Sequence, residues 1–215
     1  MNPPPTPGGR GKFRRARRGM FEHYFAFLLF VMIMTGTPGP GNLSLMAIGQ
    51  TEGFRAAIPF LCGVALGSVC LTVVVGLGLG SAINASPAAG MVLKVAGGAY
   101  ILYLAVKVMR LRIAPPGAAR RFTFAEGLML HPLSPKSWGM LVASAGQFLA
   151  PGEDFPAQAA AYVLTYFVCM LSAHSLWCLA GASMLRALGS SAAKTAVTAC
   201  MAALMVGATA YALFV

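Results

Sequence analysis

Long stretches without a charged residue are the feature that most limits what this chain can fold into. Four of them are plain in the sequence: residues 24–51, 56–93, 155–185 and 195–215. A membrane-spanning helix needs about 20 mostly apolar residues, so 56–93 is long enough for two helices and each other stretch for one. Only 10% of the chain is charged, against about a quarter in soluble domains. The sequence therefore predicts an all-α, polytopic membrane protein.

A sixth helix is expected over residues 124–149, where two charged positions interrupt an otherwise apolar stretch. A polar turn at residues 81–87 divides the 56–93 stretch, because Asn, Ser and Pro favour turns. The six expected helices cover about residues 21–50, 56–80, 88–109, 124–149, 157–185 and 195–215, in one transmembrane domain over 20–215. Three helices per half would turn the second half over, which predicts a 3 + 3 inverted repeat.

The distribution of Lys and Arg predicts which way the helices face. The loops after helices 1, 3 and 5 hold eight of them, whereas the opposite side has only Lys94 within residues 20–215. Loops rich in Lys and Arg stay cytoplasmic, so both termini are predicted to face outward. The net charge of +11 is thus explained by membrane orientation, and no nucleic-acid partner is expected.

The first 19 residues do not fit this orientation, because six Lys and Arg lie between positions 10 and 18. The segment is rich in Pro, Gly and Arg, a composition typical of disorder. Met20 stands directly before the first expected helix. We therefore expect residues 1–19 to be a disordered or non-native extension, with translation starting at Met20.

The first apolar stretch contains a motif that breaks a helix at membrane depth: Thr37, Pro38, Gly39, Pro40, Gly41 and Asn42. Pro38 and Pro40 cannot donate to the carbonyls of Met34 and Gly36, which predicts that these two oxygens are left free. Non-helical backbone is tolerated at that depth only where it is buried in protein or lines a cavity.

A second interruption, at residues 131–136, falls in the fourth expected helix. It contains His131, Ser134, Pro135 and Lys136. Each half of the chain therefore begins with a broken helix. Paired breaks in corresponding positions point to the binding site of a transporter.

Several segments resemble the LysE/RhtB family of amino-acid exporters, and the resemblance extends over residues 20–215. They are Thr37-Pro38-Gly39-Pro40 with Asn42-Leu43, Glu52-Gly53-Phe54-Arg55, Gly97-Gly98-Ala99-Tyr100, Ser134-Pro135-Lys136-Ser137-Trp138 and Gln147-Phe148. One departure is Ser134, where the family usually has Asn. The resemblance implies an exporter of amino acids or related metabolites in the bacterial inner membrane, driven by protons. We also expect a transporter rather than an enzyme, without a cofactor. In that membrane, the outward-facing termini predicted from the Lys and Arg distribution would be periplasmic.

A zwitterionic amino acid needs an anion site and a cation site close together. The N–H groups of Gly41, Asn42 and Leu43, at the start of a new helix, suit a carboxylate. The carbonyls freed by the prolines suit an ammonium group. The Asn42 side chain both donates and accepts, as does Gln147 if it faces inward.

Lys136 is the second candidate for holding the carboxylate. A charge inside a membrane helix costs about 2.5 to 3.5 kcal/mol at the bilayer centre and is usually functional. The structural alternative is a lysine that snorkels to the interface. No acidic residue lies in the middle of a predicted helix, and a cationic side chain would need one as a partner. Neutral amino acids are therefore the expected substrates.

Proton coupling has three candidates. His131 lies in the second break and titrates near neutral pH, so it ranks first. His174 lies among polar residues of a long helix, where a buried neutral histidine is the ordinary case. Glu126 begins the fourth helix, where an acid in the first turn stabilises the helix dipole.

Two other readings remain. The five cysteines have no metal or C-x-x-C spacing, and small buried hydrophobes are the simpler interpretation. A membrane-embedded enzyme or thiol-disulfide conductor would instead depend on Cys70 or Cys169. A non-transporting scaffold gives no reason for two breaks. The sequence leaves the substrate and the oligomeric state open, a homo-oligomer included.

Overall fold

The computed structural model describes residues 7–78, 86–113, 121–150, 152, 154–187 and 190–214, and every regular element in them is an α-helix. The all-α prediction is thus confirmed. The helices are α1 (Pro7–Gly36), α2 (Pro40–Glu52), α3 (Phe54–Gly76), α5 (Pro87–Ile113), α6 (Phe124–Leu130), α7 (Pro135–Phe148), α8 (Phe155–Ala187) and α9 (Ser191–Phe214).

Fewer than six of these helices qualify as membrane spans by length and composition. Four do so alone, within α3, α5, α8 and α9, and a fifth span is the bent pair Glu22–Gly36 and Pro40–Glu52. The other broken helix is divided into α6 with 7 residues and α7 with 14. This count does not reach six spans, so the expected arrangement of six spans in a 3 + 3 inverted repeat stays a prediction.

Helix α1 includes part of the N-terminal segment. It begins at Pro7, so residues 7–19 are helical, and residues 1–6 lie outside the described part of the chain. The status of residues 1–19 as a disordered or non-native extension stays a prediction. Proline is favoured in the first turn of a helix, and Arg and Lys are good helix formers. The apolar half of α1 therefore continues into its basic half without a stop signal.

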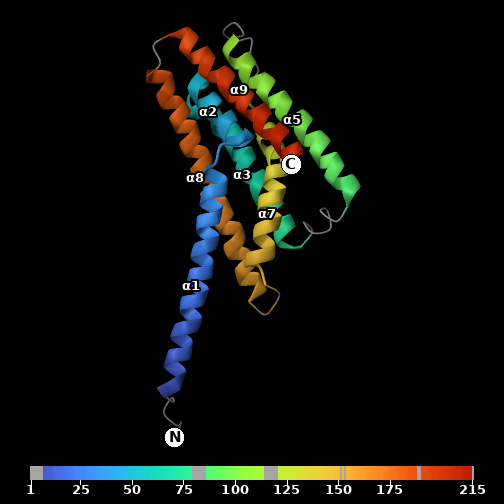
Figure 1. Cartoon of the computed structure of the whole chain (residues 1–215). Helices are drawn as coiled ribbons and strands as arrows, with labels where there is room; N and C mark the ends of the chain where they lie inside the picture. Colours follow the sequence, from blue (N-terminus) through green and yellow to red (C-terminus); the bar gives the residue numbers. More distant parts are fainter. Residues whose placement is uncertain are drawn as a thin grey trace.

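The helices alternate in direction along a bundle (Figure 1). The chain rises through α1 and α2, descends α3, rises α5, descends α6 and α7, rises α8 and descends α9. Helix α8 contacts α1, α2 and α3, while α5 pairs with α9. The basic half of α1 extends beyond the other helices.

Glycines allow the closest helix contacts, as small residues do in lipid. A Cβ atom on Gly63 would lie 2.0 Å from the carbonyl oxygen of Phe124, and one on Gly67 would lie 2.2 Å from that of Leu128. Helix α6 is therefore pressed against α3. Similarly, a Cβ on Gly97 of α5 would lie 2.2 Å from the Leu133 oxygen, so α5 supports the second break directly.

Candidate functional site

The first break separates α1 from α2, and the two helices meet at an angle of 53°. Gly39 has an extended backbone and Pro40 is the first residue of α2. Proline restricts the residue before it to extended conformations and suits the first turn of a helix. The predicted break in the first helix is thus confirmed at residues 37–39.

The carbonyls expected to be free at this break are occupied, which corrects the prediction. The Thr37 hydroxyl donates to the Met34 oxygen at 2.9 Å, and the Trp177 indole donates to the Gly36 oxygen at 3.1 Å. Asn42 donates to the Thr35 and Thr37 oxygens, both at 2.8 Å. An unpaired carbonyl in lipid is costly, so side chains have replaced the lost backbone bonds.

The N–H groups at the start of α2 are only partly available. The Leu43 N–H donates to the Gly39 oxygen at 2.9 Å, so it cannot belong to an anion site as predicted. The N–H groups of Gly41 and Asn42 lie in the first turn, which provides them with no acceptor inside the helix. Two donors of the predicted three therefore remain.

At the second break, between α6 and α7, residues close in sequence form the hydrogen bonds that stabilise it. Ser134 caps α7 by accepting from the Ser137 N–H at 3.4 Å, and Pro135 is the first residue of that helix. The Trp138 indole donates to the Pro132 oxygen at 2.8 Å. His131 Nδ1 lies 2.9 Å from the Ser137 hydroxyl. The predicted break in the fourth helix is thus confirmed at residues 131–134.

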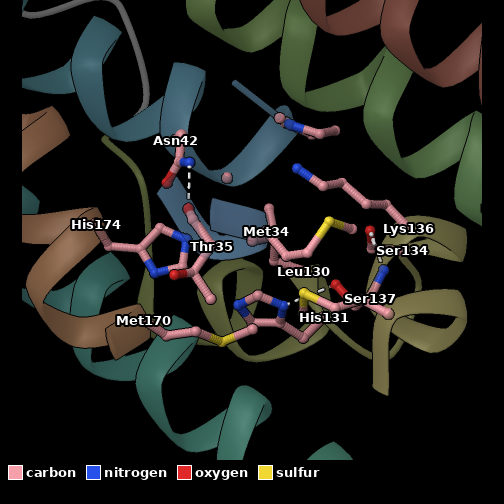
Figure 2. A pocket seen from close by; sticks show the side chains of 14 residues that line it. Met34, Thr35, Asn42, Leu130, His131, Ser134, Lys136, Ser137, Met170 and His174 are labelled. Carbon is pink, nitrogen blue, oxygen red and sulfur yellow. Dashed lines mark hydrogen bonds between the residues drawn. The ribbon is translucent and has the colours of Figure 1, made fainter. Parts of the chain in front are cut away.

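The two breaks meet at one cavity of about 40 Å³, which is room for a few water molecules. Figure 2 shows the side chains that surround it, with His174 of α8 on one side and Lys136 of α7 on the other. Segments almost 100 residues apart in the sequence therefore share this space. The lining residues are Met34, Thr35, Gly39, Pro40, Gly41, Asn42, Leu130, His131, Ser134, Lys136, Ser137, Met140, Met170 and His174.

Lys136 crosses from the second break to the first. Its Nζ lies 3.4 Å from both the carbonyl and the hydroxyl oxygen of Thr37. A Cβ atom on Gly39 would come within 3.3 Å of the same nitrogen. The ammonium group therefore lies against the start of α2, beside the N–H groups that suit an anion.

Two buried polar atoms at the cavity have no hydrogen-bond partner within the described part of the chain: Asn42 Oδ1 and His131 Nε2. Asn42 is 4% exposed and His131 is 5% exposed. The ring of His131 packs edge-on against that of His174, with centroids 5.5 Å apart. Buried polar groups normally find partners, so these two atoms mark unused binding capacity.

Two predicted residues lie elsewhere. Gln147 is exposed at the far end of α7 and lines another cavity. Glu126 makes a capping box with Thr123 and an ion pair with Lys107 at 2.5 Å, where Tyr103 also donates to its carboxylate. Neither is among the residues that line the cavity.

Other residues at the site were not predicted. Thr35, Leu130, Ser137, Met140 and Met170 complete the lining, together with Met34, of which only the carbonyl was predicted. Ser137 follows Lys136 directly, so its place one turn into α7 could have suggested a partner for His131. The cysteines are all free, and none of them is among the described residues at the cavity.

Known proteins with a similar sequence are membrane and efflux proteins. The homoserine/homoserine lactone efflux protein of Salmonella typhimurium (strain LT2) is 31% identical over 144 residues, 64% of this chain and 70% of that protein. The cysteine/O-acetylserine efflux protein of Escherichia coli (strain K12) is 32% identical over 110 residues, 51% of each. An uncharacterized membrane protein of Vibrio cholerae serotype O1 is 28% identical over 138 residues, 61% of this chain and 67% of that protein. No solved structure matches the chain.

The family model described as LysE type translocator matches residues 31–214. That range begins in α1 before the first break and includes both breaks and every residue around the cavity. The resemblance seen in the motifs is thereby confirmed over most of the chain. This protein therefore belongs to the LysE-type translocators, which are transporters and not enzymes.

Proposed function

We propose that this protein exports neutral amino acids or closely related metabolites across the bacterial inner membrane in exchange for protons. The observation that carries the proposal is the meeting of both helix breaks at one cavity, with a positive end of a helix on each side. The names of the efflux relatives support the direction of transport. The cavity has room for only a few waters, so the breaks must open for a substrate to enter.

The substrate carboxylate would bind between the starts of α2 and α7. The N–H groups of Gly41 and Asn42 and the Lys136 ammonium all face this region. Helix N-termini stabilise anions through their free donors and the helix dipole. A substrate carboxylate would replace the long contacts from Lys136 to Thr37 with shorter, charge-assisted bonds.

The substrate ammonium would bind at the two unpaired atoms, Asn42 Oδ1 and His131 Nε2. When the Nδ1–H of His131 donates to Ser137, Nε2 carries a free lone pair and accepts. None of the described lining residues is an Asp or Glu. A second positive charge on the substrate would therefore be buried without compensation, which favours neutral side chains.

Exchange for protons follows from competition at His131. A proton on Nε2 turns an acceptor into a donor and places a positive charge where the substrate ammonium binds. Binding of substrate and of the proton would then exclude each other. His174 and Lys136 face the same cavity, and both would add to the repulsion between a charged His131 and the ammonium group.

The proposed orientation places both termini in the periplasm, on the side to which the basic half of α1 points. The bias of Lys and Arg in the loops of residues 20–215 supports it. The basic residues of the N-terminal segment oppose it. A single cysteine at Ser86, before α5, should react with an impermeant thiol reagent added to intact cells; reaction only in inside-out vesicles would reverse the orientation.

The test of function is uptake into inside-out membrane vesicles, with and without an imposed pH gradient. The probes are homoserine, cysteine and O-acetylserine, with lysine as the cationic comparison. We expect accumulation of at least one neutral compound, loss of accumulation with an uncoupler, and no accumulation of lysine. Accumulation of lysine alone would contradict the substrate class, and accumulation of none of the compounds would contradict the function.

The variant His131→Ala tests the coupling separately. It should make accumulation independent of the pH gradient before it prevents binding, because the histidine contributes the proton and only part of the ammonium site. The matched variant is Thr209→Ala on α9, which removes a buried polar group outside both this cavity and the larger one between α1, α7 and α8. If His131→Ala keeps the full pH dependence, the coupling assignment is wrong while export itself stands.

A further inference from the structure

A second, larger cavity of about 800 Å³ lies between α1, α7 and α8. We call it the vestibule. Its polar residues are His23 on α1, Gln147 on α7, Asp154 before α8 and Gln158 on α8, and its wall includes Phe27, Phe148 and Tyr162. It lies toward the protruding end of α1, whereas the site described above lies at the other end of that helix.

One face of α8 connects the two cavities. Tyr162 lines the vestibule, and Met170 and His174 line the cavity at the breaks. Together with Tyr166 these residues recur every four positions, so they lie on one face of the helix. At a rise of 1.5 Å per residue, the stripe from Tyr162 to His174 is about 18 Å long.

The other two helices provide matching stripes. On α1, Phe27 lines the vestibule and Met34 lines the cavity at the breaks, two turns apart with buried Val31 between them. On α7, Met140 lines the cavity at the breaks and Gln147 lines the vestibule. Side chains of three helices thus extend from one cavity to the other.

The path is closed in the middle by a cluster that we call the aromatic plug, consisting of Phe27, Tyr162, Tyr166 and Ser144. The Phe27 ring stacks on that of Tyr162 with centroids 5.3 Å apart, and the rings of Tyr162 and Tyr166 are 5.0 Å apart. All four residues are buried. The plug belongs to the same packed cluster as Met140 and Met170, which line the cavity at the breaks.

Hydroxyl groups make the plug different from an ordinary apolar seal. The Ser144 hydroxyl lies 2.8 Å from the hydroxyls of both Tyr162 and Tyr166, and Tyr162 donates to the Leu141 oxygen at 2.8 Å. These groups satisfy one another while the path is closed. When the rings part, the same hydroxyls can hydrogen-bond a polar solute that has lost its water.

We propose that the vestibule is a second binding site for the exported compound, on its way out, and that the aromatic plug is the gate between the two sites. This inference rests on the proposed function for the identity of the compound. The vestibule suits a zwitterion, because Asp154 offers a carboxylate to an ammonium group and His23, Gln147 and Gln158 offer donors to a carboxylate. Its size also exceeds that of the closed cavity at the breaks by far.

The gate can be tested without knowing the substrate. After replacement of the five native cysteines, Met140→Cys places a thiol at the cavity, and its reaction with a small, charged, impermeant thiol reagent is followed in cells and in inside-out vesicles. Ala161→Cys, in the vestibule, identifies the side from which the vestibule opens. From that side, Phe27→Ala or Tyr166→Ala should accelerate labelling of Met140→Cys roughly tenfold or more, because loss of a buried ring frees the passage.

Two controls separate a gate from general loosening. Phe60→Ala removes an equally buried ring from the other packed cluster and should leave the rate unchanged. Tyr166→Phe keeps the ring and should also leave the plug closed. An equal acceleration by Phe60→Ala, or none by Phe27→Ala and Tyr166→Ala, would overturn the gate.

The vestibule as a binding site is tested by a matched pair of neighbours on α8. Ala161 lines the vestibule, whereas Ala160 lines an apolar groove beside α3. A bulky thiol reagent attached to Ala161→Cys should stop homoserine export, and the same reagent on Ala160→Cys should not. Equal export by both modified proteins would refute the second site. If neither unmodified protein exports homoserine, cysteine or O-acetylserine, the proposed function fails, while the labelling test of the gate still stands.

Discussion

At each of the two helix breaks an indole N–H donates to a backbone carbonyl, but the distance along the chain between donor and acceptor differs greatly. The protein has two tryptophans, and each donates its indole N–H to a carbonyl at one break. At the second break the donor is Trp138, six residues from its acceptor Pro132; at the first it is Trp177, 141 residues from Gly36. The indole bond is therefore local at the second break, whereas at the first break it comes from another helix and adds to the local bonds of Thr37 and Asn42.

This difference indicates which break can move. The second break keeps its hydrogen bonds if α6 and α7 move as one body, since His131, Ser137 and Trp138 are all within it. The first break depends on Trp177 of α8 and Lys136 of α7. Any motion of α1 and α2 against those helices therefore exchanges hydrogen bonds at the first break.

The largest effect is expected from removing the first break. The double variant Pro38→Ala with Pro40→Ala restores two backbone donors and lets α1 and α2 form one straight helix. We expect normal insertion but export no higher than in membranes without the protein. The matched variant is Pro59→Ala, which removes a proline inside α3 away from the breaks, and it should export. Normal export by the double variant would place the site elsewhere.

A large effect on stability is expected at Asn42. Asn42→Leu removes the Asn42 donor from the Thr35 oxygen and leaves the Thr37 oxygen with only the 3.4 Å contact from Lys136, at a cost of about 1 to 3 kcal/mol for the lost Thr35 bond alone. Ser137→Ala, at the locally stabilised break, should cost less, about 1 kcal/mol. Unfolding of both purified variants in detergent measures the difference. Equal losses would contradict the larger cost expected at the first break.

A moderate effect on binding is expected at Lys136. Lys136→Gln should raise the apparent substrate constant for export roughly tenfold, the usual loss for a hydrogen bond to a charged group. Lys136→Arg should also be impaired, because the wider guanidinium does not fit against Gly39. Lys94→Gln, on the exposed side of α5, serves as the control. Normal export kinetics in both Lys136 variants would show that Lys136 has a structural role and does not bind the substrate.

The smallest effect separates the two tryptophans. Trp177→Phe and Trp138→Phe each remove one hydrogen bond, worth about 1 kcal/mol of stability. Only Trp177→Phe should also slow export, by roughly fivefold, because only it joins the first break to another helix. Thermal unfolding and initial export rates provide the two measurements. Equal slowing by both variants would remove the distinction between a mobile and a fixed break.

The positions of the breaks could be predicted because proline and glycine act locally. Pro40 and Pro135 start new helices wherever the chain lies in space. The partners of the freed carbonyls could not be predicted, since Trp177 reaches Gly36 only through the packing of α8 against α1. A proline removes a backbone donor wherever it occurs, whereas a replacement donor such as Trp177 is positioned by the tertiary structure.

The positions of individual side chains along a broken helix could not be predicted from the sequence either. Gln147 was expected to contribute to the site if it faced inward. However, α7 begins only after the break at residues 131–134, and Gln147 lies three turns beyond the start of that helix. Lys107 lies near the end of the helix expected over residues 88–109, where nothing in the sequence marks a partner for it. Only the fold shows that it is 8% exposed and paired with Glu126.

Because of where its two tryptophans lie, the intrinsic fluorescence of the protein can also be used to follow the breaks. Every indole in the chain belongs to one of the two breaks, so tryptophan emission from the unlabelled protein, excited at wavelengths that tyrosine does not absorb, reports on those two places. The variant Trp138→Phe would leave a single emitter on the first break. A shift in the emission maximum of that variant on adding homoserine would then record the exchange of the Gly36 hydrogen bond as it happens.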